Sequence, residues 1–152
     1  MDLQQNITDA TTEIFETMIM MEITPGDPLK ELVTTFRHTV SGLVGMAGTF
    51  KGLLAVHIPN EVAKAITSNF LGLEVEEIND DVQDAIGELA NMLAGNIKMA
   101  IDESGKDVTL SIPSAVHGDE YSLNCLANAD WVVMPFTTPA GEFLVELQIE
   151  KA

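Results

Sequence analysis

The stretch that begins at Asp81 constrains the fold most, because it predicts one long helix with two different faces. Apolar residues recur there at steps of three and four, as the buried side of an amphipathic helix requires. They are Val82, Ile86, Leu89, Leu93, Ile97 and Ala100. At about 100° per residue, a second stripe lies on the opposite side of the helix. It consists of Asp84, Glu88, Asn91, Gly95 and Lys98.

The second stripe has an unusual composition for an exposed helical surface. Such surfaces usually carry Lys and Glu, whereas this one carries Asn91 and Gly95, with Gly87 beside it. Each glycine costs roughly 0.8–1 kcal/mol against alanine in a helix interior. A helix with these residues on its outer side leaves room for another surface to approach. From the stripe alone, the alternative is an ordinary solvated face.

The same residues carry a resemblance to a known family. Asp84, Glu88 and Asn91 form the pattern Asp-x-x-x-Glu-x-x-Asn, and Pro113 follows after 21 intervening residues, 92 to 112. This pattern, within the run Gly-Glu-Leu-Ala-Asn-Met-Leu-Ala-Gly-Asn, resembles the signature of the chemotaxis phosphatases of the CheC and CheX type. Those proteins remove the phosphoryl group from the aspartyl-phosphate of the response regulator CheY. The resemblance therefore implies a hydrolase in two-component signalling, and its single complete motif is similar to the CheX type.

The resemblance also implies a role for each residue of the stripe. Phosphoryl transfer needs mainly positioning and electrostatic stabilisation, and a neutral amide can orient an attacking water without repelling an anionic phosphoryl group. We expect Asn91 to do this, and Glu88 to pair with a lysine of the regulator's active site. Asp84 either extends that contact or is simply solvated. Gly87 and Gly95 would allow a close approach of the partner's backbone.

Cofactor and partners follow from the same resemblance. The regulator's own Mg²⁺ would serve as the metal, so we expect this chain to hold no cofactor of its own. The expected partners are a phosphorylated CheY-like receiver domain and a second copy, because CheX-like proteins are homodimers joined through their sheets. Two alternatives stay open: a non-catalytic receiver-binding or flagellar-switch-like module of the same superfamily, and an unrelated structural dimer.

Composition limits the classes of partner. The net charge of −17, with only seven Lys and Arg residues, argues against binding to nucleic acid or to anionic membranes. No apolar run approaches the roughly 18 residues of a transmembrane helix, and the first residues do not resemble a signal peptide. The single cysteine, Cys125, fits a cytoplasmic protein. His38, His57 and His117 lack the spacing of metal ligands.

The charge also has a consequence for docking. A receiver's active site is itself acidic, so this chain and its expected partner should repel each other at long range. We therefore expect weak, transient binding that tightens modestly as salt screens the repulsion.

The remaining patterns predict an α+β fold in one domain that spans residues 1–152. Helical periodicity covers 5–22, 61–71 and 81 to about 103, where Asn79 or Asp80 provides the N-terminal cap. Alternating apolar residues predict strands over 40–46, 50–58, 108–112, 121–125, 131–136 and 143–149. Paired strands with short turns indicate an antiparallel β-sheet with the two long helices packed against it.

The two long helices also indicate an internal duplication. Asp9, Glu13 and Glu16 have the spacing of Asp84, Glu88 and Asn91, at an offset of 75 residues in each case (84−9, 88−13, 91−16). We therefore predict two similar α-β-β halves, of which the first lacks the Asn. The alternative is that any two amphipathic helices align in this way.

Overall fold

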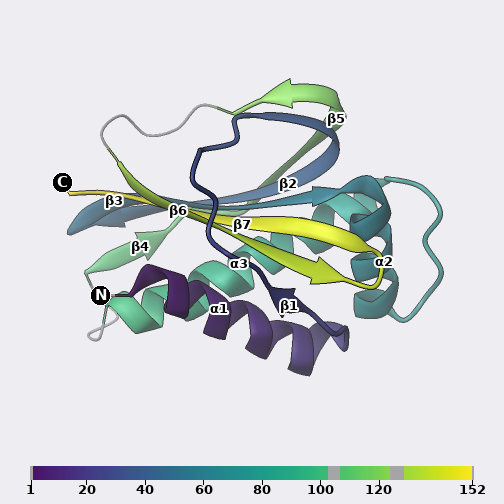
Figure 1. The fold of residues 1–152 in the computed structure, drawn as a ribbon, viewed down its shortest axis with the longest axis horizontal. Coiled ribbons are helices and arrows are strands. Elements are labelled where there is room, and N and C mark those ends of the chain that lie inside the picture. The colour runs from purple at the N-terminus through teal and green to yellow at the C-terminus, as the bar shows by residue number, and fades with distance from the viewer. Residues whose placement is uncertain (1, 103–106, 124–128, 152) are drawn as a thin grey trace.

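Two hairpins form the centre of a seven-stranded antiparallel sheet (Figure 1) in the computed structural model, which describes residues 2–102, 107–123 and 129–151. The helices are α1 (Leu3–Ile14), its continuation η1 (Phe15–Ile19), α2 (Asn60–Leu71) and α3 (Asp80–Ile101). The strands are β1 (Thr24–Pro25), β2 (Thr35–Gly48), β3 (Phe50–Pro59), β4 (Val108–Leu110), β5 (Ser114–Ser122), β6 (Asp130–Thr138) and β7 (Gly141–Lys151).

The strand order confirms the predicted fold class. Along the sheet it is β1-β6-β7-β3-β2-β4, and β5 also pairs with β2. The hairpins β2-β3 and β6-β7 meet where β3 pairs with β7, with Leu54 opposite Leu147. Each hairpin belongs to a half that also supplies one long helix, α1 or α3. The protein is therefore an α+β fold built from two α-β-β halves.

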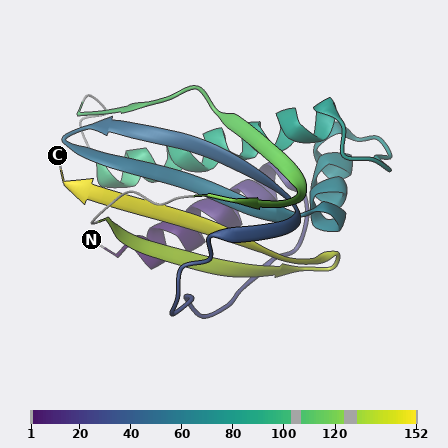
Figure 2. The same cartoon turned by 90° about the horizontal axis from the view of Figure 1, so that it is seen from above.

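One face of the sheet buries the hydrophobic core. Helices α1 and α3 lie side by side beneath this face, and α2 closes one end (Figures 1 and 2). Alternate residues of the strands point toward the helices, as the two-residue period of a strand requires. Fully buried examples are Val40, Val44, Leu54, Val56, Val145 and Leu147.

The first helix differs from the prediction in its last turn. It is α-helical only to Ile14, then forms one π-helical turn, and ends where Met20 adopts a left-handed conformation (φ 58°). A π turn holds more residues than an α turn, so it rotates the apolar stripe along the sequence. Phe15 and Ile19 are consequently buried, and Met18, which a continued α-helix would place on the buried side four residues after Ile14, is 48% exposed.

Helix α3 agrees with the predicted stripe. Asn79 caps it, since its side chain accepts a hydrogen bond from the Val82 N–H at 3.1 Å. The stripe residues Val82, Ile86, Leu89, Leu93 and Ile97 are fully buried, whereas Ala100 is exposed, because it lies in the last turn. Within the described residues, no helix has the length and apolar character needed to cross a membrane.

The strands that follow α3 differ most from the prediction. Strand β4 ends at Leu110, and β5 occupies Ser114–Ser122 rather than 121–125. The predicted end of α3 near Glu103 and the position of Cys125 lie outside the described residues. The first hairpin is also longer than predicted, because β2 begins at Thr35 and pairs with β5 over this added length.

The other face of the sheet carries a buried polar chain that the sequence did not predict. The Ser41 hydroxyl lies 2.7 Å from His57 Nδ1 and 2.6 Å from the Tyr121 hydroxyl, and His57 Nε2 lies 2.8 Å from Glu146 Oε1. Phe36 stacks on the His57 ring at 4.0 Å between centroids. These contacts fasten β2, β3, β5 and β7 to one another.

Candidate functional site

The polar stripe of α3 lies on the accessible side of the helix, as predicted. Asp84 and Glu88 are exposed, and Asn91 is half-buried. Within the described part of the chain, none of these three side chains has a hydrogen-bond or ion-pair partner. Their donors and acceptors are therefore available to a molecule that approaches this face.

A shallow cavity of about 400 Å³ opens beside the stripe. Its walls come from the outer side of α3 and from the segment that leads into β5. The lining residues are Gln83, Asp84, Gly87, Glu88, Pro113, Ser114 and Ala115. The fold therefore brings Pro113, the distant member of the sequence pattern, to the same place as Asp84 and Glu88.

The interruption between β4 and β5 sets the position of Pro113. Proline has no N–H to donate to a strand ladder, so the strand breaks there. Ser111 preserves the register across the break, because its N–H donates to the Gly45 carbonyl at 2.9 Å and its hydroxyl accepts from the Gly45 N–H at 2.8 Å. Strand β5 then resumes pairing with β2 at Ser114. The loop with Pro113 thus projects toward α3.

The helix that carries the site rests directly on β2. A Cβ atom added at Gly42 would lie 2.7 Å from the Ile86 carbonyl oxygen and 3.1 Å from the Ala90 Cβ. Only glycine allows this close approach of strand and helix backbones. The contact lies behind Gly87 and Glu88, so it determines how far the stripe stands from the sheet.

The two glycines predicted to admit a partner have different surroundings. Gly87 is buried, and a Cβ added there would lie 3.9 Å from the Pro113 Cβ, an ordinary contact distance. Gly95 is half-buried, and a Cβ added there would meet no atom within 4 Å. Gly87 therefore packs against this chain's own loop, whereas Gly95 leaves open space on the outer side of α3.

Ile112 is a surface feature that sequence reasoning missed. It is 87% exposed, next to Pro113 in the chain. The alternation of Val108, Leu110 and Ile112 predicted that all three belong to one strand with one buried side. Because β4 ends at Leu110, Ile112 lies outside the strand and presents a large apolar side chain to solvent, one residue before Pro113.

The site has an acidic electrostatic character. Asp80 and Asp81 occupy the first turn of α3, where they interact favourably with the helix dipole, and Asp84 and Glu88 follow on the next turns. The Asn91 amide at the end of this series can both accept and donate hydrogen bonds. The arrangement offers carboxylates for a cationic group and an amide for a water or an oxygen atom.

Comparison with known proteins connects this arrangement to one family. The profile of the family described as "Chemotaxis phosphatase CheX" matches residues 40–137, which include the stripe and Pro113. The CheX of Desulfovibrio desulfuricans has a similar structure, with a TM-score of 0.87 and 29% sequence identity over 99% of this chain and 100% of that chain.

Two further relatives extend the comparison. The CheY-P phosphatase CheX of Thermotoga maritima is 30% identical over 87 residues, 57% of this chain and 56% of that protein, so the match spans about half the length of this curated relative. The CheX of Borrelia burgdorferi, solved in a complex with CheY, BeF₃ and Mg²⁺, has the same fold, with a TM-score of 0.83 and 22% identity over 99% of both chains.

The family profile covers well over half of the described sheet, together with α3 and its polar stripe. By this match the chain belongs to the CheX family of chemotaxis phosphatases.

Proposed function

We propose that this protein is a phosphatase that hydrolyses the aspartyl-phosphate of a CheY-like response regulator. One observation carries the proposal: Glu88 and Asn91 stand on the accessible side of a well-packed helix, without partners among the described residues. Membership of the CheX family supports it, as does the name of the Thermotoga maritima relative, CheY-P phosphatase.

In this proposal, Asn91 orients the attacking water. Its amide oxygen accepts a hydrogen bond from the water, and the neutral side chain avoids repulsion by the phosphoryl oxygens. Holding the nucleophile in line supplies most of the acceleration, because phosphoryl transfer depends on positioning. The water attacks phosphorus, the acyl-phosphate P–O bond breaks, and the products are the free aspartate carboxylate and inorganic phosphate.

The surroundings of Asn91 position the regulator. Glu88 lies one turn earlier on the same side and pairs with the lysine of the receiver's active site, while Asp84 extends the acidic surface. The open space at Gly95 accommodates the receiver's backbone, and Ile112 provides an apolar contact next to Pro113 in the chain. Gly87 packs against the loop with Pro113 and so forms part of the cavity that faces the receiver.

The metal in this proposal belongs to the receiver. Among the described residues, no group of three or more His, Cys, Asp or Glu side chains is arranged to hold a metal ion. Mg²⁺ bound by the receiver would neutralise the phosphoryl oxygens, and this chain would bring the amide and the water. Two-component signalling of this kind places the protein in the cytoplasm.

We further propose that the protein forms a homodimer through its sheet. Strand β5 pairs with β2 on one side, and no described strand pairs with its other side. An exposed strand edge is a natural surface for pairing with a second copy. Sedimentation of the purified protein tests this, and a single monomeric species at micromolar concentration would contradict it.

The decay of acyl-phosphate on a phosphorylated CheY-like receiver from the same organism tests the function directly. We expect the wild-type protein to accelerate decay. Asn91→Ala should lower the acceleration about 100-fold, because the water loses its orienting group. Glu88→Ala should act mainly through binding, and raise the KM for the receiver roughly tenfold.

Glu13→Ala on α1 is the matched control, since Glu13 lies 75 residues before Glu88 on the corresponding helix and is likewise exposed. We expect it to retain full activity. Binding of the BeF₃-activated receiver without acceleration would favour a recognition module instead. Neither binding nor acceleration, across several receivers, would mean that the stripe is only a solvated face.

A further inference from the structure

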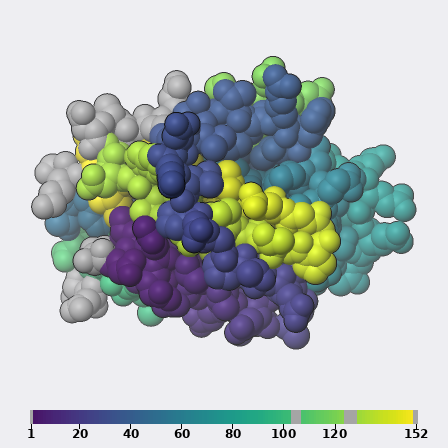
Figure 3. Space-filling view, viewed as in Figure 1, coloured from purple at the N-terminus to yellow at the C-terminus, as the bar shows by residue number. Residues whose placement is uncertain are grey.

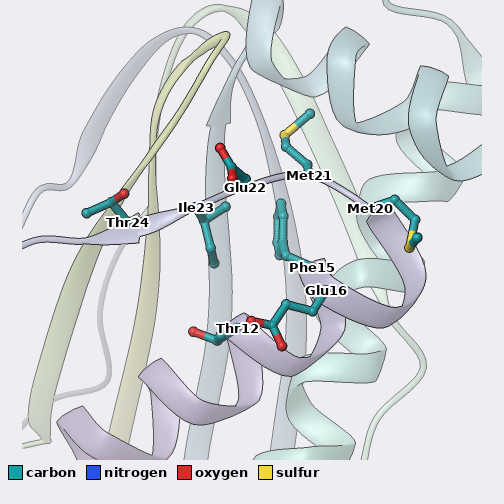
Figure 4. Close-up of a pocket in the computed structure, with 8 residues that line it drawn as sticks. All are labelled: Thr12, Phe15, Glu16, Met20, Met21, Glu22, Ile23 and Thr24. Atoms are coloured by element: carbon teal, nitrogen blue, oxygen red, sulfur yellow. The ribbon is translucent and has the colours of Figure 1, made fainter.

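A second groove, of about 550 Å³, lies along α1 and shares no residue with the α3 site. Its floor includes Phe15 and Ile23, one wall carries Glu16, and the opposite wall carries Glu22 (Figure 4). Met20 stands at one end and is 73% exposed. The groove therefore combines an apolar floor with a carboxylate on either side.

The groove continues past Met20 toward the other half of the molecule. A neighbouring cavity of about 420 Å³ shares Met20, Met21 and Glu22 with it and reaches Asn69 on α2. Figure 3 shows α1 and the segment after it along one accessible face of the molecule. The two cavities share three lining residues, so together they offer a surface long enough for an extended peptide.

The backbone at this place departs from regular helix in two ways. The turn Phe15–Ile19 is π-helical, and Met20 follows with a left-handed φ of 58°, which disfavours any residue except glycine. A strained non-glycine residue persists only where the surroundings hold it, and such residues concentrate at binding and catalytic sites. Here the strain presents a flexible thioether at the groove, and methionine adapts to varied apolar partners.

The charge of this region is entirely negative. Residues 2–29 contain no Lys or Arg. Their acidic residues are Asp2, Asp9, Glu13, Glu16, Glu22 and Asp27. Glu16 and Glu22, which line opposite sides of the groove, have no ion-pair or hydrogen-bond partner for their carboxylates in the described part of the chain. Charge complementarity therefore favours a cationic occupant of the groove.

We propose that this groove binds a short segment of a partner protein in which an apolar side chain is flanked by Lys or Arg. The apolar side chain contacts Ile23 and Met20, and the flanking cations pair with Glu16 and Glu22. Under the offset of 75 residues, Glu16 takes the place of Asn91, so α1 offers a binding surface that lacks the water-orienting amide. The site is independent of the phosphatase activity.

Nuclear magnetic resonance of the protein with ¹³C-methyl methionine tests the proposal. The probe is a short synthetic peptide with central leucines between arginine pairs. We expect a saturable shift of the Met20 and Met21 methyl resonances. One comparison peptide replaces the leucines with glycines and another replaces the arginines with glutamates, and we expect at least about tenfold weaker binding from each.

Three variants separate a binding role from a structural one. Glu16→Gln and Glu22→Gln should each weaken peptide binding by up to about fivefold, the usual limit for an exposed ion pair. Met20→Gly relieves the left-handed strain, so it should leave the melting temperature unchanged or higher while weakening binding. Glu13→Gln is the control on the same helix, outside the groove, and should bind as wild type.

Four results would overturn the proposal. They are equal binding of the glycine-substituted peptide, shifts at other methionines only, unchanged binding by the two glutamine variants, and methyl shifts that follow protein concentration without any peptide. The last result would assign the groove to a second copy of this chain.

Discussion

The same substitution, glycine to alanine, should change stability in opposite directions on the two sides of α3. At Gly42, a new Cβ would lie 2.7 Å from the Ile86 carbonyl oxygen. An ordinary contact requires about 3.4 Å, so strand and helix must separate by roughly 0.7 Å. Overpacking of this kind costs about 1–3 kcal/mol. We expect Gly42→Ala to destabilise the protein by that amount.

At Gly95 the same substitution should change the stability in the opposite direction. A Cβ there meets no atom within 4 Å, and the residue lies in the interior of a 22-residue helix. Alanine should therefore stabilise the protein by about 0.8–1 kcal/mol through helix propensity alone. In a chain of this length, that corresponds to a rise of roughly 2–4 °C in melting temperature.

Urea unfolding measures the free energy of unfolding of both variants. An unchanged slope m would show that the native and unfolded states are otherwise the same. Gly95→Ala should also slow acyl-phosphate hydrolysis, because its methyl group enters the space assigned to the receiver. A gain in stability together with a loss of activity cannot come from damage to the fold. A Gly42→Ala protein as stable as wild type would refute the close packing of α3 on β2, and a destabilised Gly95→Ala protein would refute the open surroundings of Gly95.

Three further predictions follow from individual contacts. Asn79→Ala removes the cap of α3 and should lower the free energy of unfolding by about 1 kcal/mol, as measured in urea. An unchanged urea midpoint would show that the cap contributes nothing. Burial raises the pKa of Tyr121 above its usual 10.0, although its hydrogen bond with Ser41 lowers it in part, so stability should be insensitive to this group below about pH 10 and fall as the pH rises through the folded-state pKa. Because Tyr121 is the chain's single tyrosine, the ultraviolet absorbance of tyrosinate reports it directly, and ionisation below pH 10 in the folded protein would contradict the burial. Raising the salt concentration should tighten receiver binding modestly, since it screens the repulsion of a −17 chain from an acidic partner, and steep weakening with salt would contradict this.

The features that local periodicity encodes were predictable from the sequence. The two sides of α3, its cap and the β2-β3 and β6-β7 hairpins follow from steps of three and four, from a capping residue and from alternation. Asp84, Glu88 and Asn91 share one accessible side for the same reason. What these residues do stays a proposal, because a helical stripe alone does not distinguish a binding surface from a solvated one.

Short elements were predicted less well, because small local energies decide them. The π turn in the first helix shifts the register of the residues after Ile14, so Met18 is exposed. Strand β5 and the two-residue β1 depend on pairing with β2 and β6, and their own side chains do not alternate clearly between buried and exposed.

The sequence by itself determined that α3 has one apolar side and one side that carries a carboxylate and an amide, since the helical period places residues three or four apart together. Only the tertiary structure decided what stands beside that surface. Pro113 meets Gly87, and Gly42 meets Ile86, through contacts between distant parts of the chain. Such contacts depend on strand register and on the break between β4 and β5, and the spacing of apolar residues predicts neither of them.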